Sequence, residues 1–174
     1  MRRLAVLLAL LALPALAQPF EIPIPEGNRA DLEEAPPRPG PGDVEARARV
    51  LFDAIVADDP SAARGFFLSR EAFRAIKGIA DPDSLYDRIV RMYEHDIHEL
   101  HAQLPAGAEF VRFEFSRRRG WVRLREESNR LPYWAQRHSW IVYRVGAREA
   151  RFEVRTMIAW DGEWFITHLS EFRH

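Results

Sequence analysis

The stretch WDGEWFITHL, residues 160–169, decides the fold, because Asp161-Gly162 between two apolar runs is a strong signal for a two-residue β-hairpin. From Gly107 onward the apolar side chains recur every second residue, as strands require. The strands predicted in this half cover residues 110–115, 121–125, 135–145, 150–160 and 163–172. The C-terminal half is therefore predicted to form an antiparallel β-meander.

Before Gly107 the apolar spacing is that of helices. The strongest start signal is Asp81-Pro82, which supplies a capping carboxylate and a proline for the first turn. Helices are predicted over residues 43–57, 61–68, 69–78 and 81–104. Helices followed by a meander indicate an α+β fold, with the helices packed on one face of a curled antiparallel sheet.

The first 17 residues are typical of a signal peptide. Two arginines precede an uncharged run over residues 4–13, and an A-x-A pattern ends at Ala17. That run is shorter than the roughly 20 apolar residues that cross a bilayer, so no transmembrane segment is expected. We expect cleavage after Ala17 and a soluble periplasmic or secreted protein.

Residues 18–42 contain seven of the twelve prolines and predict a disordered linker. The folded part is then a single domain over residues 43–174, which is long enough to bury a sizeable core. The chain has no cysteine, so neither disulfides nor a lipid anchor are expected. These features together predict a leader, a linker and one domain.

The charge of the chain is nearly balanced, at −1 for the whole sequence and −3 without the two leader arginines. This balance argues against a dedicated nucleic-acid binder, which carries a strong basic excess. Lys77 is the one lysine among 25 basic residues, and we interpret the bias toward arginine as genomic nucleotide composition.

The order of elements and the closing hairpin resemble the NTF2-like, or SnoaL-like, α+β cone superfamily, including its exported bacterial members. Its members often end in an aromatic residue, Asp-Gly, then Trp, Ile and a polar residue such as histidine, as residues 160–168 do. The resemblance implies a pocket between helices and sheet, and dimerisation through the sheet. It implies no single reaction, because isomerases, dehydratases, transport factors and ligand binders share this fold.

Three of the six histidines, His95, His98 and His101, lie among carboxylates at helical spacing. Histidines and carboxylates are common metal ligands. On a helix, however, these three fan over about 120° of the surface and cannot meet at one ion. We therefore expect a solvated helix face and no metal site. His98 and His101 are weak candidates for metal ligands.

A ligand pocket is predicted around His168; the alternative is that this histidine is hydrogen-bonded within the core or sheet. The residues expected to line the pocket are Tyr93, Trp140, Tyr143, Trp164 and His168. Asp96 lies on the flank of an apolar helix stripe, where a carboxylate is unusual unless paired. We expect it to form an ion pair with Arg144 or Arg155; a role as a pocket acid or base is the alternative.

No nucleophile, phosphate-binding or metalloprotease motif occurs in the chain, so no cofactor and no assigned catalytic residue are expected. The favoured function is a non-catalytic exported module that binds a small apolar ligand or an envelope protein. Two alternatives stay open. One is an isomerase, dehydratase or hydrolase that uses His168 with Asp96; the other is a structural or assembly protein that forms a homodimer through its sheet.

Overall fold

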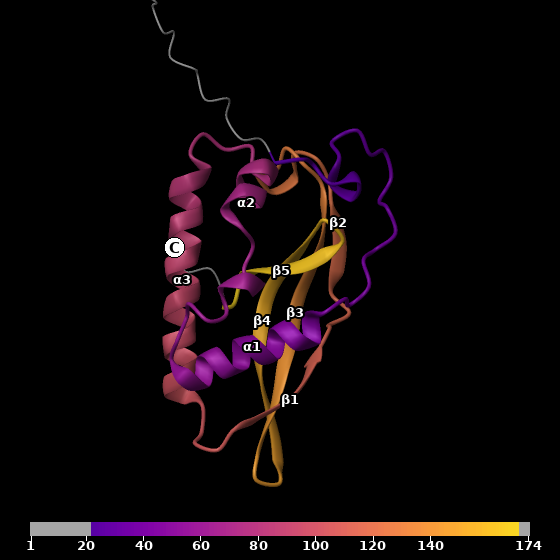
Figure 1. Ribbon diagram of the computed structural model, residues 1–174. Coiled ribbons are helices and arrows are strands. Elements are labelled where there is room, and N and C mark those ends of the chain that lie inside the picture. Colours follow the sequence, from indigo (N-terminus) through magenta and orange to yellow (C-terminus); the bar gives the residue numbers. More distant parts are fainter. Residues whose placement is uncertain (1–21, 171–174) are drawn as a thin grey trace, which may run out of the picture.

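The computed structural model describes residues 22–170, and the predicted signal peptide lies outside them. Three α-helices pack with a five-stranded antiparallel sheet, which confirms the predicted α+β class (Figure 1). The elements are α1 (Val44–Ala57), α2 (Arg70–Ile76), α3 (Pro82–Gln103), β1 (Glu109–Glu114), β2 (Arg119–Val122), β3 (Tyr133–Val145), β4 (Arg148–Trp160) and β5 (Glu163–His168). No helix within residues 22–170 combines the length and apolar character that a membrane crossing requires.

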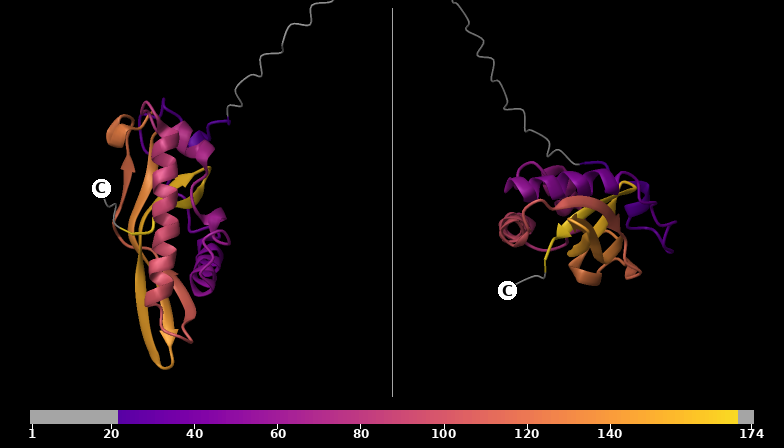
Figure 2. Two further views of the ribbon diagram at one scale, coloured as in Figure 1. Left: turned by 90° about the vertical axis from the view of Figure 1, so that its left-hand side faces the viewer. Right: turned by 90° about the horizontal axis from the view of Figure 1, so that it is seen from below.

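The sheet has the order β1-β3-β4-β5, and β2 pairs with β3 at the same edge as β1. Asp161 and Gly162 close the β4–β5 hairpin with φ angles of 53° and 77°, and positive values at both positions are what a type I′ turn requires. The sheet is strongly curled, as the view from below shows (Figure 2). Helix α1 crosses the strands, and α3 stands along the side of the sheet (Figures 1 and 2).

The predicted cap of α3 forms, and α2 is capped by a serine. Asp81 accepts a hydrogen bond from the Ser84 amide at 3.0 Å, and Ser69 Oγ accepts one from the Ala72 amide at 3.1 Å. The helix predicted over residues 61–68 is wrong. Only a 3₁₀ turn forms at Arg64–Phe66, because the chain then extends and the Leu68 amide donates to the Ile166 carbonyl at 2.9 Å. This hydrogen bond gives one backbone carbonyl at the free edge of β5 a partner.

One hydrophobic core joins α1 and α3 to the sheet. Its largest fully buried side chains include Leu51, Phe52, Ile55, Tyr93, Ile97, Ile141, Met157, Trp164 and Ile166. The core draws on nearly every element of the described chain, so residues 43–170 form one packed unit.

Residues 22–42 lie along the molecule beside β2 (Figure 1), where we had expected a disordered linker. Asn28 is only 3% exposed, and its side-chain amide donates to the Pro132 and Ala159 carbonyls at 3.0 and 3.2 Å. The indole N–H groups of Trp134 and Trp164 donate to the Pro36 and Gly40 carbonyls, each at 3.0 Å. The proline-rich segment is ordered here because its free carbonyls satisfy donors that would otherwise be buried without partners.

Candidate functional site: a cavity between α2 and the sheet

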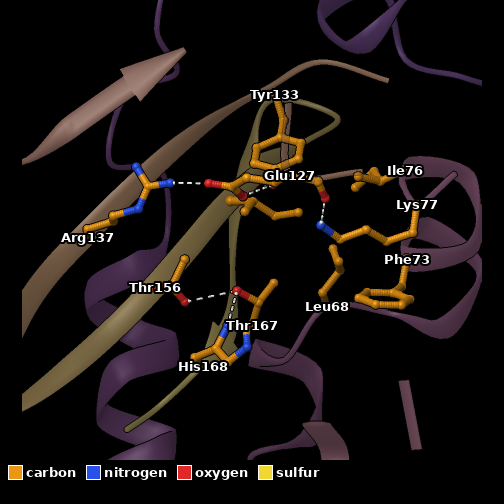
Figure 3. Close-up of a pocket in the computed structure, with 11 residues that line it drawn as sticks. Leu68, Phe73, Ile76, Lys77, Glu127, Tyr133, Arg137, Thr156, Thr167 and His168 are labelled. Atoms are coloured by element: carbon orange, nitrogen blue, oxygen red, sulfur yellow. Dashed lines mark hydrogen bonds and ion pairs between the residues drawn. The ribbon is translucent and has the colours of Figure 1, made fainter. Parts of the chain in front are cut away.

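A cavity of about 150 Å³ lies between α2 and the sheet (Figure 3). We call it the α2 cavity. Its lining residues are Leu68, Phe73, Ile76, Lys77, Glu127, Tyr133, Arg137, Thr156, Ile158, Thr167 and His168. Of the residues predicted to line a pocket, His168 is the one that lies in this cavity.

A β-bulge in β5 determines where His168 points. Thr156 of β4 pairs with His168, whereas the next residue, Met157, pairs with Ile166, so Thr167 is an extra residue in β5. Consecutive residues of β4 face opposite sides of the sheet, and paired residues share a side. His168 and Ile166 therefore face opposite sides, although their spacing alone predicts one side.

The strand register also brings Arg137 to the cavity. Arg137 pairs with Thr156, which pairs with His168, so the three side chains lie next to one another on one face of β3, β4 and β5. The Thr167 hydroxyl lies 3.1 Å from His168 Nδ1 and 3.4 Å from the Thr156 carbonyl (Figure 3). These contacts fix the histidine ring at one end of the cavity.

The loop between β2 and β3 closes the cavity over the end of α2. The Gly78 amide donates to the Ser128 carbonyl at 2.8 Å, and the Arg130 amide donates to the Ile76 carbonyl at 2.8 Å. Arg130 also donates from its guanidinium to the Ala75 carbonyl at 2.9 Å. A cation at the C-terminal end of a helix satisfies its last carbonyls, so this loop is held firmly against α2.

Glu127 is at the centre of the polar part of the lining. The Glu127 carboxylate accepts hydrogen bonds from Arg137 Nη2 at 2.6 Å and from the Tyr133 hydroxyl at 2.8 Å. Lys77 Nζ donates to the Glu127 carbonyl at 3.0 Å and to Asn129 Oδ1 at 2.9 Å. Arg137 is thus the ion-pair partner of Glu127, while the two acceptors that Lys77 contacts are neutral.

Burial shifts the pKa values of three groups around the cavity. It lowers the pKa of His168 to about 4, with the positive charge of Lys77 as a further cause. It also lowers the pKa of Lys77 and, together with the negative charge of Glu127, raises that of Tyr133. At neutral pH the imidazole is uncharged, so it can accept or donate a hydrogen bond to a ligand.

Leu68, Phe73 and Ile76 form an apolar part of the lining, beside Lys77 (Figure 3). Ile158 of β4 adds a fourth apolar side chain to the lining. An apolar cavity of this size holds a molecule about as large as benzene. A pocket with an apolar body and a few convergent polar groups is the usual form of a small-ligand site. The α2 cavity has both parts.

The other residues predicted to line a pocket lie elsewhere. Tyr93 is buried against Phe67, with ring centroids 4.7 Å apart, and its hydroxyl donates to the Ala63 carbonyl at 3.3 Å. Trp164 pairs with Ala159, which faces the side of the sheet opposite to Ile158. The remaining two lie farther along β3: Tyr143 packs on Phe52, and Trp140 lies under the Arg151 guanidinium.

Asp96 lies in a separate hollow with Glu99, Leu100, Gln103, Glu153, Leu169 and Ser170. Its two carboxylate oxygens accept hydrogen bonds from the Ser170 hydroxyl at 2.7 Å and the Ser170 amide at 3.0 Å. Arg144 and Arg155, the expected partners, form ion pairs with Glu109 and Glu153. Asp96 therefore anchors the chain after β5 to α3, and it does not share a cavity with His168.

Two of the three histidines of α3 contact the C-terminal end of α1, while His95 lies 3.3 Å from Glu99 of its own helix. His98 Nδ1 lies 2.6 Å from the Asp58 carboxylate, and His101 Nδ1 lies 2.9 Å from the Ile55 carbonyl. Within residues 22–170, no three histidines or acidic side chains are grouped so that they could hold a metal ion. Both contacts join α3 to the C-terminal end of α1.

Most of the residues that line the α2 cavity are not predicted by the sequence. Lys77 and Glu127 are 50 positions apart, so no local pattern connects them. Tyr133 and Arg137 lie four positions apart in one strand, which places them on one face, but polar residues on strands usually face solvent. The one sequence signal for this site is Lys77, because it is the single lysine of the chain.

Comparisons with protein-family models, curated proteins and solved structures found no match. The function must therefore be argued from the geometry of the site.

Proposed function

We propose that this protein is a non-catalytic binding module whose α2 cavity holds a small, partly apolar ligand. The observation that carries the proposal is the mixed lining of a cavity of about 150 Å³, which combines four apolar side chains with polar groups that include Lys77, Glu127, Tyr133 and His168. The polar groups are already oriented by hydrogen bonds to one another, so a ligand would meet a preformed site at little ordering cost.

An acid–base reaction by His168 and Asp96 requires both side chains at one ligand. These residues line different hollows, on the α2 side of the sheet and beside α3. With a pKa of about 4, His168 is moreover a weak base. The geometry thus favours binding over that reaction.

We also propose membership of the NTF2-like superfamily and export with cleavage after Ala17. The membership is supported by the order of helices before an antiparallel, curled sheet, and by the position of the cavity between helix and sheet. Export is supported by the basic, apolar and small-residue pattern of residues 1–17.

Filling the α2 cavity is expected to abolish ligand binding. Thr156→Phe places an aromatic ring in the cavity next to His168, and phenylalanine is well suited to a strand. We expect at least one of three single-ring probes, phenol, benzamide or benzoate, to bind wild-type protein with 1:1 stoichiometry in a calorimetric titration. Its binding to Thr156→Phe should be weaker by about tenfold or more, the equivalent of about 1.4 kcal/mol.

The matched control is Val56→Phe, which adds a similar ring at an exposed position of α1. It should bind the probes as wild type does, and urea unfolding should show that both variants are folded. Equal binding by Thr156→Phe and wild type, or no binding of any probe to wild type, would contradict the proposal.

The export proposal predicts a defined N-terminus. When the full chain is produced in a bacterium with an active secretory pathway, the intact mass should correspond to a chain that begins at Gln18. A mature protein that retains Met1 or the leader residues in the periplasmic fraction would contradict it. The cytoplasmic fraction, in which uncleaved precursor is expected, is the internal control.

A further inference from the structure

The charge balance of the α2 cavity indicates what kind of ligand it takes. Glu127 is engaged with Arg137 and with the Tyr133 hydroxyl, and the imidazole of His168 is neutral at pH 7. Within residues 22–170, no carboxylate lies within 4.0 Å of the Lys77 ammonium, whose acceptors are a backbone carbonyl and a side-chain amide. The Glu127 carboxylate acts on Lys77 from a longer distance, but it is the ion-pair partner of Arg137, so one carboxylate faces two cations and the cavity wall keeps a net positive charge.

Lys77 is also partly shielded from solvent. It directly follows α2, and its side chain passes between the apolar residues of that helix and the loop that carries Glu127 (Figure 3). Burying a charge is costly unless a counter-charge offsets the lost hydration. An ammonium group carries three donors, and two of these are used by the Glu127 carbonyl and Asn129. A ligand anion can take the third donor and offset the partly buried charge.

The apolar lining determines the chemistry of the part of the ligand beyond its anionic group. Leu68, Phe73 and Ile76 lie on the same side of the cavity as the lysine stem, so an anion bound at Nζ has its body against these side chains (Figure 3). The volume limits that body to a single ring or a short alkyl chain. An inorganic anion would leave this apolar surface uncovered.

We propose that the ligand is a small monocarboxylate, of about the size of benzoate, whose carboxylate binds Lys77 Nζ and whose body packs against Leu68, Phe73 and Ile76. This inference rests on the proposed function and adds its substrate class. Recognition is by one charge-assisted hydrogen bond at one end and apolar contact at the other.

The single lysine of the chain allows a direct test. Labelling with [15N]lysine gives one side-chain ammonium signal, from Lys77. Benzoate should shift this signal saturably in wild-type protein, and the neutral isostere benzamide should not. Benzoate should also bind about tenfold or more tightly than benzamide, and this preference should vanish in Lys77→Met.

Each alternative outcome is informative. If benzamide or phenol binds as tightly as benzoate, the carboxylate assignment is overturned while the binding module stands. If none of the three binds, the module itself fails. Inorganic phosphate is a further probe, and a stronger effect of phosphate than of benzoate on the Lys77 signal would overturn the assignment to carboxylates. Because Lys77→Met also loses the contacts to the loop, the labelled wild-type protein supplies the decisive measurement without a variant.

Discussion

Replacing Trp164 with alanine is expected to lower the free energy of unfolding by about 3–5 kcal/mol. The indole is 1% exposed, lies 6.1 Å from the ring of Phe115, and donates a hydrogen bond to the Gly40 carbonyl. The substitution removes a large apolar side chain and leaves a carbonyl of the N-terminal segment without its donor. Urea unfolding followed by circular dichroism measures the effect.

Trp140→Ala is the matched control for this prediction. Trp140 is half-buried, pairs across the strands with Glu114 and Glu153, and carries the Arg151 guanidinium 4.2 Å above its ring. A partly exposed cation–π contact contributes about 1 kcal/mol, so this variant should lose far less stability. Equal losses in the two variants would contradict the placement of Trp164 in the core.

Lowering the pH from 7 to 4 is expected to cost the folded state about 3 kcal/mol through His168 alone. Burial lowers the pKa of this residue from 6.5 to about 4, with Lys77 acting in the same direction and Glu127 opposing it. Below pH 6.5 the unfolded chain binds a proton that the folded chain does not, so stability falls as the pH drops toward 4. A difference of about 2.5 pKa units corresponds to about 3 kcal/mol.

His168→Gln separates this contribution from that of the acidic residues. Glutamine does not titrate. Lowering the pH from 7 to 4 should therefore destabilise the variant by about 3 kcal/mol less than it destabilises wild type. Urea unfolding of both proteins at several pH values gives the comparison. Identical pH dependence in the two proteins would show that His168 is not buried as described.

The sequence predicted those features that depend on local chemistry. Asp81 caps α3 as expected because a carboxylate before a first-turn proline satisfies free amides. The Asp161-Gly162 turn formed because both residues tolerate positive φ angles. The α+β class followed from the change of apolar period at Gly107, since that period reflects which side chains each element buries.

The α2 cavity depends on features that no local sequence pattern reveals. A single extra residue, Thr167, turned His168 away from Trp164 and toward α2, and no pattern of alternation reveals a bulge. The polar wall joins Lys77, Glu127 and Arg137, which come from a helix end, a loop and a strand. The order of residues 22–42 likewise depends on distant tryptophans that require carbonyl acceptors.

The most direct test of ligand binding in the α2 cavity is a methyl NMR titration of wild-type protein with benzoate. The account predicts saturable shifts at Leu68, Ile76 and Ile158, which line the cavity, and none at Ile24 and Val56, which are exposed elsewhere. Thr156→Phe should lack these shifts. Shifts confined to the exposed methyl groups, or an unchanged spectrum at saturating benzoate, would contradict it.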